Sequence, residues 1–222
     1  METLQMKKGF TLLELLIVIA IIAILSAILI FVLNPAETLQ KGRDSQRISD
    51  FSTVNSALAL LLTTKTDISY TDLCTATSTL FVSIPTSTAV LTACTLPATQ
   101  TAWGQKGTTS ALFPVNGTGW IPVNLTANIA GGSPIATLPV DPSNTIAKGA
   151  STTCPDDTID RTTRDFYYGY ACTTSLTWEI SGALESDQFA TKEDRDANDG
   201  GSSAKRFEIG TDLSVIGAVG GN

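Results

Sequence analysis

One acidic side chain, Glu14, lies inside the most apolar segment of the chain. Residues 10–33 contain no other charged residue, and Thr11 and Ser26 are the only other polar side chains there. An ionised carboxylate at membrane depth is costly unless a cation compensates it, so ionisable residues in such segments mark function. We therefore expect Glu14 to acquire a cationic partner wherever this segment is buried.

The apolar segment itself is long enough to cross a membrane. Its 24 residues would form a helix of about 36 Å, more than the ~30 Å of a bilayer's hydrocarbon core. It is also longer than the apolar region of an ordinary secretory signal. In a plain membrane anchor, Lys7 and Lys8 would keep the N-terminus in the cytoplasm and place residues 34–222 outside. Neither the signal nor the anchor explains Glu14.

Four cysteines follow the apolar segment, and they predict disulfide chemistry. The chain has no histidine and no CxxC pair, so a zinc site would need all four cysteines at unusual spacings. Two disulfides formed in an oxidising compartment fit the pattern better. Because short loops cost less entropy to close, we expect sequence neighbours to pair among the three connectivities. This predicts the disulfides Cys74–Cys94 and Cys154–Cys172.

An acidic stretch near the C-terminus contains the side chains that suit a calcium ion. Asp194, Asp196 and Asn198 alternate as oxygen ligands do at the start of an EF-hand loop, and Asp199 follows directly. The sixth position is Asp199 rather than glycine, and the twelfth is Lys205 rather than glutamate, so the loop is not an EF-hand. We regard these four residues as candidate Ca²⁺ ligands, with a solvated acidic turn as the alternative.

The composition argues against catalysis and against nucleic acid as a partner. Without histidine, Ser-His-Asp and Cys-His arrangements are excluded, and no glycine-rich phosphate loop follows a strand. Residues 34–222 carry 12 of the 14 basic and 19 of the 21 acidic residues, so few cations are present to neutralise phosphates. We expect neither an enzyme nor a required cofactor.

The N-terminal motif carries the most specific signal. Residues 7–19, Lys-Lys-Gly-Phe-Thr-Leu-Leu-Glu-Leu-Leu-Ile-Val-Ile, resemble the N-terminus of type IV pilins and of the pseudopilins of type II secretion. In that family a membrane peptidase cuts after the glycine, and the new N-terminal residue is methylated. Carried over, cleavage falls between Gly9 and Phe10, which removes a leader of residues 1–9. The resemblance implies that Glu14 of one subunit meets the Phe10 ammonium of a neighbour when the helices pack.

The remaining sequence predicts one more helix and a late set of strands. Asn34-Pro35 should break the first helix, and apolar residues at three- and four-residue steps predict an amphipathic helix to about Thr64. Strands are expected at 166–171, 176–181 and 207–209, with short extended pieces at 120–123 and 138–142. The stretch 65–114 shows little periodicity, and we expect an irregular excursion with short strands or turns.

Two further features of this part of the chain leave alternatives open. Residues 138–142, Leu-Pro-Val-Asp-Pro, resemble a turn of the major pseudopilins. The early part of the second helix contains a charged cluster, which either meets neighbouring subunits or forms a solvated face. Its members are Lys41, Arg43, Asp44, Arg47 and Asp50.

Together these expectations describe an α+β protein with the pilin fold, in which a long N-terminal helix packs against an antiparallel sheet. The expected parts are the leader 1–9, a transmembrane and polymerisation helix 10–33, its amphipathic continuation 34–64, and a globular head 65–222. The expected function is that of a structural subunit of a type IV pilus-like filament. The alternative is a major pseudopilin of a type II secretion or DNA-uptake system.

The expected partners follow from that function. They are identical subunits, the prepilin peptidase and the assembly machinery. The subunit would lie in the cytoplasmic membrane before assembly and in an extracellular or cell-surface filament afterwards.

Overall fold

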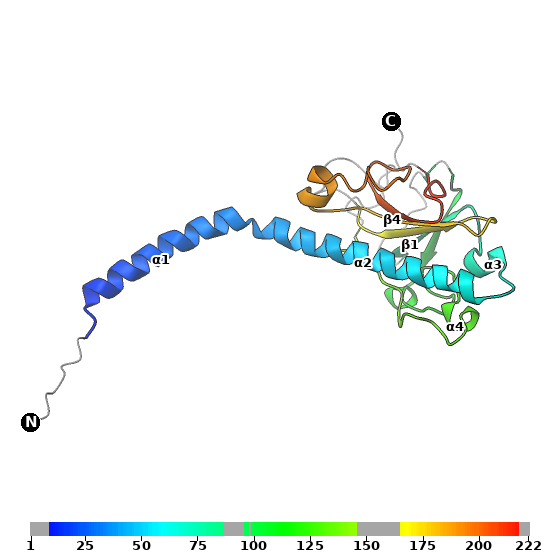
Figure 1. Ribbon diagram of the computed structural model, residues 1–222, viewed down its shortest axis with the longest axis horizontal. Helices are drawn as coiled ribbons and strands as arrows, with labels where there is room; N and C mark the ends of the chain where they lie inside the picture. The colour runs from blue at the N-terminus through cyan, green and yellow to red at the C-terminus, as the bar shows by residue number, and fades with distance from the viewer. Residues whose placement is uncertain (1–8, 87–95, 98, 146–164, 218–222) are drawn as a thin grey trace, which may run out of the picture. The chain divides into compact units, whose positions relative to one another are not determined.

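The computed structural model describes residues 9–86, 96–97, 99–145 and 165–217, without the side chains of residues 30–33. It contains two compact units, Met1–Leu39 and Gln40–Asn222. The first unit contains the helix α1 (Leu12–Leu33), and the second unit is an α+β head (Figure 1). The expected fold class is therefore confirmed. Of the residues on which predictions were made, Cys94, Cys154 and residues 1–8 of the expected leader, with Lys7 and Lys8, lie outside the described part of the chain.

The break between the two long helices lies at Asn34, as the sequence predicts. Asn34 has a left-handed backbone (φ 38°), a conformation that asparagine tolerates better than most residues. Its carbonyl accepts a hydrogen bond from Thr38 N (3.2 Å) and thereby starts α2 (Pro35–Thr64). Pro35 is the first residue of α2. A backbone N–H at this position would make no hydrogen bond within the helix, so proline is tolerated there.

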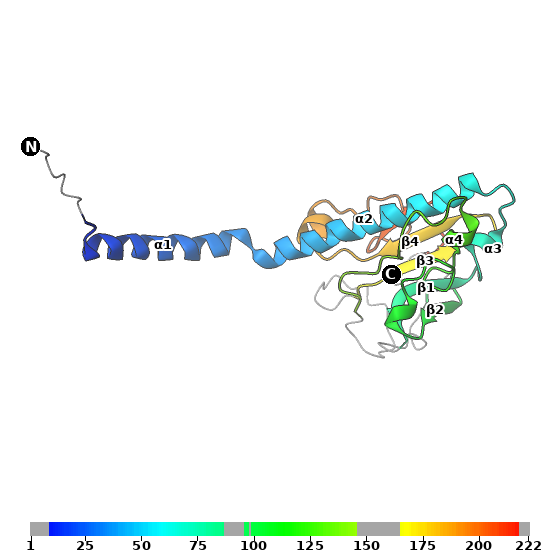
Figure 2. The ribbon, with the colours of Figure 1, turned by 90° about the horizontal axis from the view of Figure 1, so that it is seen from below.

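From Gln40 onward, α2 lies along one face of the sheet (Figures 1 and 2). Its buried apolar residues recur at three- and four-residue steps, which is the pattern of a helix that packs on one side. These residues are Phe51, Val54, Ala57, Leu58 and Leu61. The predicted amphipathic helix is present, and its buried stripe packs into the core.

The sheet contains five described strands in the spatial order β2-β1-β3-β4-β5. Their bounds are Thr79–Pro85 (β1), Ala102–Lys106 (β2), Tyr168–Cys172 (β3), Trp178–Gly182 (β4) and Phe207–Gly210 (β5). The pairs β1–β3, β3–β4 and β4–β5 are antiparallel, but β2 runs parallel to β1. The expectation of a purely antiparallel sheet is therefore wrong at one edge, where β1 and β2 run in the same direction.

Both faces of the sheet are covered. On the α2 side, Tyr168, Tyr170 and Cys172 join the apolar stripe of the helix, as do Trp178 and Ile180. On the opposite side a smaller core is closed by the C-terminal segment, with Leu80, Val82, Ile84, Tyr167, Ala171, Val215 and Ile216. The alternation along β3 follows from the period of two in a strand. Polar side chains on either face therefore become buried unless they lie at the sheet's rim.

The main differences from expectation lie between α2 and β3. The stretch 65–114, expected to be an irregular excursion with short strands or turns, contains the strands β1 and β2 as well as α3 (Tyr70–Leu73) and the short helix η2 (Thr109–Ala111). The pieces expected to be extended at 120–123 and 138–142 belong to no strand. Their apolar side chains are buried instead, among them Trp120 and Leu138. Two further short helices, α4 (Leu125–Asn128) and η3 (Gln188–Lys192), lie in connections.

Candidate processing and assembly site

The motif residues lie at the first turn of α1. Thr11 caps the helix, and its Oγ1 accepts a hydrogen bond from Glu14 N (3.2 Å). Gly9 and Phe10 precede the helix and are exposed, and Phe10 retains 77% of its accessible surface. A Cβ built on Gly9 would meet nothing within 4 Å. The Gly9–Phe10 peptide bond is therefore outside regular structure, where an extended backbone can enter a peptidase.

Glu14 is the acidic residue of the first turn of α1. A carboxylate there is favoured by the positive end of the helix dipole. The Glu14 side chain is exposed, and no ion pair joins it to another described residue. The dipole compensates a fraction of a charge only, so the need for a cation persists once the segment leaves water. The pairing of Glu14 with a neighbour's Phe10 ammonium stays a prediction.

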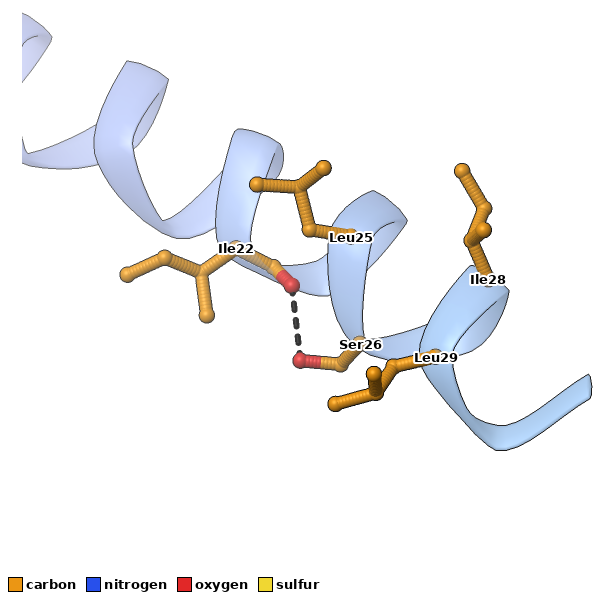
Figure 3. A pocket seen from close by; sticks show the side chains of 5 residues that line it. All are labelled: Ile22, Leu25, Ser26, Ile28 and Leu29. Atoms are coloured by element: carbon orange, nitrogen blue, oxygen red, sulfur yellow. Dashed lines mark hydrogen bonds between the residues drawn. The ribbon is translucent and has the colours of Figure 1, made fainter. Parts of the chain in front are cut away.

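The rest of α1 has the length and composition of a membrane span. Leu12–Leu29 is the candidate, and none of it is buried within the chain. An apolar groove of about 440 Å³ lies along the helix. Figure 3 shows the side chains that line it, which are Ile22, Leu25, Ser26, Ile28 and Leu29. The Ser26 hydroxyl donates to the Ile22 carbonyl (2.8 Å), so this polar side chain is satisfied inside its own helix. Such a surface suits lipid tails or the apolar face of another helix.

A buried ion cluster lies near the start of the head. It includes charged residues of α2 for which the sequence left two alternatives open, a contact with neighbouring subunits or a solvated face. Arg47 has no exposed surface and binds Asp141 with two hydrogen bonds (2.8 and 2.9 Å). Its Nη1 also donates to Asp44 (2.7 Å) and to Glu185 (3.2 Å). Arg43 donates a further pair of hydrogen bonds to Glu185. We call these five residues the head ion cluster.

For Asp44 and Arg47, the head ion cluster contradicts both alternatives that the sequence left open. Asp44 and Arg47 form neither a solvated face nor a surface for neighbours, because they are buried in their own chain. Asp50 accepts a hydrogen bond from the Tyr168 hydroxyl (2.8 Å). The partners of Arg47 come from residue 141 and residue 185, far away in sequence, which no helical periodicity can reveal. Asp141 is the acidic residue of the Leu-Pro-Val-Asp-Pro turn, so that turn serves to hold α2.

Electrostatics within the head ion cluster favour the charged forms. Burial lowers the pKa of Arg47, but hydrogen bonds and charge from Asp141 and Asp44 outweigh it and raise the pKa. Burial raises the pKa of Glu185, but hydrogen bonds from Arg43 and Arg47 hold it below its usual value. The Asp44 carboxylate also accepts the backbone N–H groups of Glu185 and Ser186 (2.7–3.1 Å). The cluster therefore joins α2 to two loops of the head.

The disulfide pattern differs from the prediction. Cys74 is bonded to Cys172, with the Cα atoms 5.6 Å apart and a sequence separation of 98. The predicted pairs Cys74–Cys94 and Cys154–Cys172 are therefore both wrong. The entropy cost of closing a loop, on which the prediction rested, is a property of the unfolded chain only. In the folded head, β1 follows Cys74 closely and pairs with β3, which ends at Cys172, so the sheet topology brings the two cysteines together.

The candidate calcium ligands do not converge in the structure. The two oxygens of Asp199 accept the backbone N–H groups of Gly201 (2.8 Å) and Glu208 (2.5 Å). Asp194 has a left-handed backbone, and its carbonyl, rather than its carboxylate, binds Asn198. In the described part of the chain, no three His, Cys, Asp or Glu residues form a group that could hold a metal ion. Calcium binding stays a prediction, tested by whether chelator lowers thermal stability and whether Asp196→Asn removes that effect.

Sequence reasoning missed a pair of buried carboxyl groups on the face of the sheet away from α2. Glu179 of β4 and Glu208 of β5 are 0% and 2% exposed. One oxygen of each accepts a backbone N–H, from Ile216 (2.8 Å) and Ser203 (3.1 Å), whereas the other oxygen of each is buried and has the neighbouring carboxyl group as its hydrogen-bond partner. Burial, with a contribution from the neighbouring Glu208, raises the pKa of Glu179 to about 9. The signal in the sequence that could have indicated this pair was an acidic residue within an otherwise apolar strand.

Comparison with known families agrees with the motif and its position. Residues 4–30 match the family described as the prokaryotic N-terminal methylation motif. No curated protein and no solved structure matches the chain. The matched residues include the Gly9–Phe10 bond, Glu14 and most of α1. The chain thus carries the prepilin signature that type IV pilins and pseudopilins share.

Proposed function

We propose that the chain is the structural subunit of a type IV pilus-like filament. The observation that carries the proposal is the match of residues 4–30 to the N-terminal methylation motif, on a helix whose apolar span Leu12–Leu29 is not buried within the chain. Such a helix is unfavourable in water, and it becomes covered either by lipid or by other helices. The membrane would hold the subunit before assembly, and the apolar core of a polymer would hold it afterwards.

In this proposal, processing and assembly are coupled through one charge pair. Cleavage after Gly9 creates an ammonium group on Phe10, and methylation keeps it positive. Glu14 then finds its cation on the neighbouring subunit, so the carboxylate is compensated only when helices pack. The head contributes the filament surface, and its disulfide suits an oxidising compartment outside the cytoplasm.

A second function deserves consideration because of one observation. The Leu-Pro-Val-Asp-Pro turn, which resembles that of major pseudopilins, supplies Asp141 to the head ion cluster. The alternative is therefore a major pseudopilin that forms a short periplasmic filament for type II secretion or DNA uptake. Both functions use the same processing and the same helix packing, and they differ in filament length and location.

Electron microscopy of material sheared from the cell surface tests the proposal, with mass spectrometry of its main protein band. The pilus predicts long filaments whose subunit starts at N-methylated Phe10. Filaments absent from the surface, with processed subunit confined to the cell envelope, would favour the pseudopilin. A subunit that retains residues 1–9 in a mature filament would contradict both. As a control for processing, substitution of Gly9 by a bulky residue should leave the leader attached.

A further inference from the structure

The outward side of α2 carries no charge over most of the head. Every exposed residue of the helix between Ser45 and Thr63 is uncharged; these residues are Ser45, Gln46, Ser49, Ser52, Thr53, Ser56, Ala59, Leu60 and Thr63. We call this set the neutral face. The charged residues of the same stretch turn inward, Arg47 to the head ion cluster and Asp50 to the Tyr168 hydroxyl. A solvated helix face normally carries charges, so this one is unusual.

The composition of the neutral face also costs helix stability. Serine and threonine are poorer helix formers than alanine, glutamate or lysine, and exposure alone does not require them. Several of their hydroxyls donate to carbonyls of their own helix: Thr53 to Ser49 O (2.8 Å) and Ser56 to Ser52 O (2.7 Å). These donors are already satisfied, so covering them would leave no hydrogen bond unmade.

A groove adjoins the neutral face. Its volume is about 470 Å³, and it lies between α2 and the loop that contains Pro134 and Ile135. On the helix side it is lined by Ser52, Thr53, Ser56, Ala57 and Leu60. Leu60 is one of the two large apolar side chains that remain exposed in the described part of the head, with 39% of its surface accessible. The groove thus offers small side chains and apolar contact without charge.

Charge decides which occupant suits this surface. The protein has a net charge of -7, and residues 34–222, with 12 basic and 19 acidic residues, carry all of it, so two copies repel one another over most of their surfaces. They can approach where neither presents an acidic group, and the neutral face is such a place. A polyanion or an anionic membrane would need basic residues there, and the face has none.

We propose that the neutral face of α2 and its groove contact the head of a second copy of this chain in the filament. The inference rests on the proposed function, because only a polymer formed through α1 brings the α2 helices of neighbouring subunits together. Only Asn34 separates the end of α1 from the start of α2, so the helix that carries the neutral face follows α1 directly along the chain. The contact adds a head-to-head interaction to the helix packing.

The test places one charge in the groove. Ser56→Glu puts a carboxylate where an acidic neighbour would approach. Because glutamate is a better helix former than serine, the substitution should leave the head itself as stable as before. Ser56→Ala is the uncharged control at the same position. Ser175→Glu adds the same charge in the exposed turn between β3 and β4, outside the neutral face. The full chain is expressed with its assembly machinery, and sheared filaments are quantified against processed subunit in the cells.

We expect Ser56→Glu to lower the filament yield about tenfold or more with normal processing, because an uncompensated charge in a buried contact weakens it at least by that factor. Ser56→Ala and Ser175→Glu should assemble like the wild type. Wild-type yields from Ser56→Glu, or an equal loss from Ser175→Glu, would overturn the proposed contact while the filament itself stands. Wild-type protein that forms no filaments would instead overturn the proposed function and this contact with it.

Discussion

α1 and the head treat their charged side chains in opposite ways. In the head, Arg47 is fully buried, and the carboxylates of Asp44, Asp141 and Glu185 surround it. In α1, Glu14 is exposed and has no ion pair with any described residue. The buried charges of the head ion cluster are paired within the head, whereas the cation that we propose for Glu14 belongs to a neighbouring subunit.

The same contrast holds for apolar surface. The core of the head packs α2, the sheet and the loops between residues 112 and 138 around fully buried aromatic side chains. The candidate span Leu12–Leu29 of α1 has no buried part at all. A folded head therefore does not require assembly, but α1 requires either lipid or other copies. Mutations in the two regions should accordingly change different observables.

The largest effect should come from Glu14. Glu14→Ala removes the carboxylate that is proposed to pair with the neighbour's Phe10 ammonium, so cleavage should continue while filament yield falls about tenfold or more. The yield of sheared filaments and the intact mass of the subunit measure the two effects separately. Ser26→Ala is the matched control in the same helix, because the Ser26 hydroxyl is satisfied by Ile22 O. Normal filaments from Glu14→Ala would remove the proposed pairing and, with it, the contrast between the two regions.

The second largest effect should appear in the stability of the head. Arg47→Met leaves Asp44, Asp141 and Glu185 buried without their main cation, and breaking a buried ion pair in this way costs about 3–5 kcal/mol. Chemical unfolding of the full-length protein in detergent, followed by tryptophan fluorescence, measures the change. Arg195→Met is the control, because Arg195 and its partner Glu193 lie at the surface, where an ion pair contributes little to stability. Equal costs for the two substitutions would show that the head ion cluster contributes no more than a surface pair.

The disulfide should have a comparable or smaller effect on the head. Replacing both Cys74 and Cys172 by alanine should lower the free energy of unfolding by about 2–5 kcal/mol, because a long loop of the unfolded chain is no longer closed. Mass spectrometry of unreduced peptides checks the pairing directly and should recover Cys74 linked to Cys172. A peptide that links Cys74 to Cys94 would contradict the structure and restore the pairing expected from loop length.

The sequence predicted the parts of the molecule whose signal is local. The apolar run, the break at Asn34 and the amphipathic stripe of α2 depend on neighbouring residues, and the strands β3, β4 and β5 lie within two residues of their predicted positions. The processing motif is equally local. These features survive folding because packing reinforces preferences that the segment already has.

The features that were missed depend on contacts between distant residues. β1 lies in a Thr- and Ser-rich stretch, yet it occupies an interior position of the sheet because its residues Leu80 to Ile84 fill both cores. Cys74 meets Cys172 only because β1 pairs with β3. The partners of Arg47 are supplied by two loops that have no periodic pattern. None of these pairings can be read from spacing along the chain.

The smallest expected effect concerns the pH dependence of the head's stability. Burial and the neighbouring Glu208 raise the pKa of Glu179 to about 9 in the folded protein, above the ~4.3 of an unperturbed glutamate. The folded state therefore holds a proton that the unfolded state releases, and this contribution to stability is complete below about pH 4 and lost as pH rises toward 9. Burial also raises the pKa of Glu208, so the pair disfavours two charges on this face of the sheet.

Glu179→Gln tests this difference between buried and exposed carboxylates. The amide is neutral at every pH, and it keeps an oxygen to accept the Ile216 N–H. The variant should therefore be more stable than wild type at pH 8 by about 1 kcal/mol or more, since one pKa unit corresponds to about 1.4 kcal/mol. The difference should shrink as the pH is lowered to 5.

Unfolding free energies measured at several pH values give the slope of this difference. Glu193→Gln, at an exposed carboxylate, is the control and should not show this pattern. A variant that is less stable than wild type at pH 8 would mean that Glu179 is ionised in the folded head and has a cationic partner, as Glu14 is proposed to have in the filament.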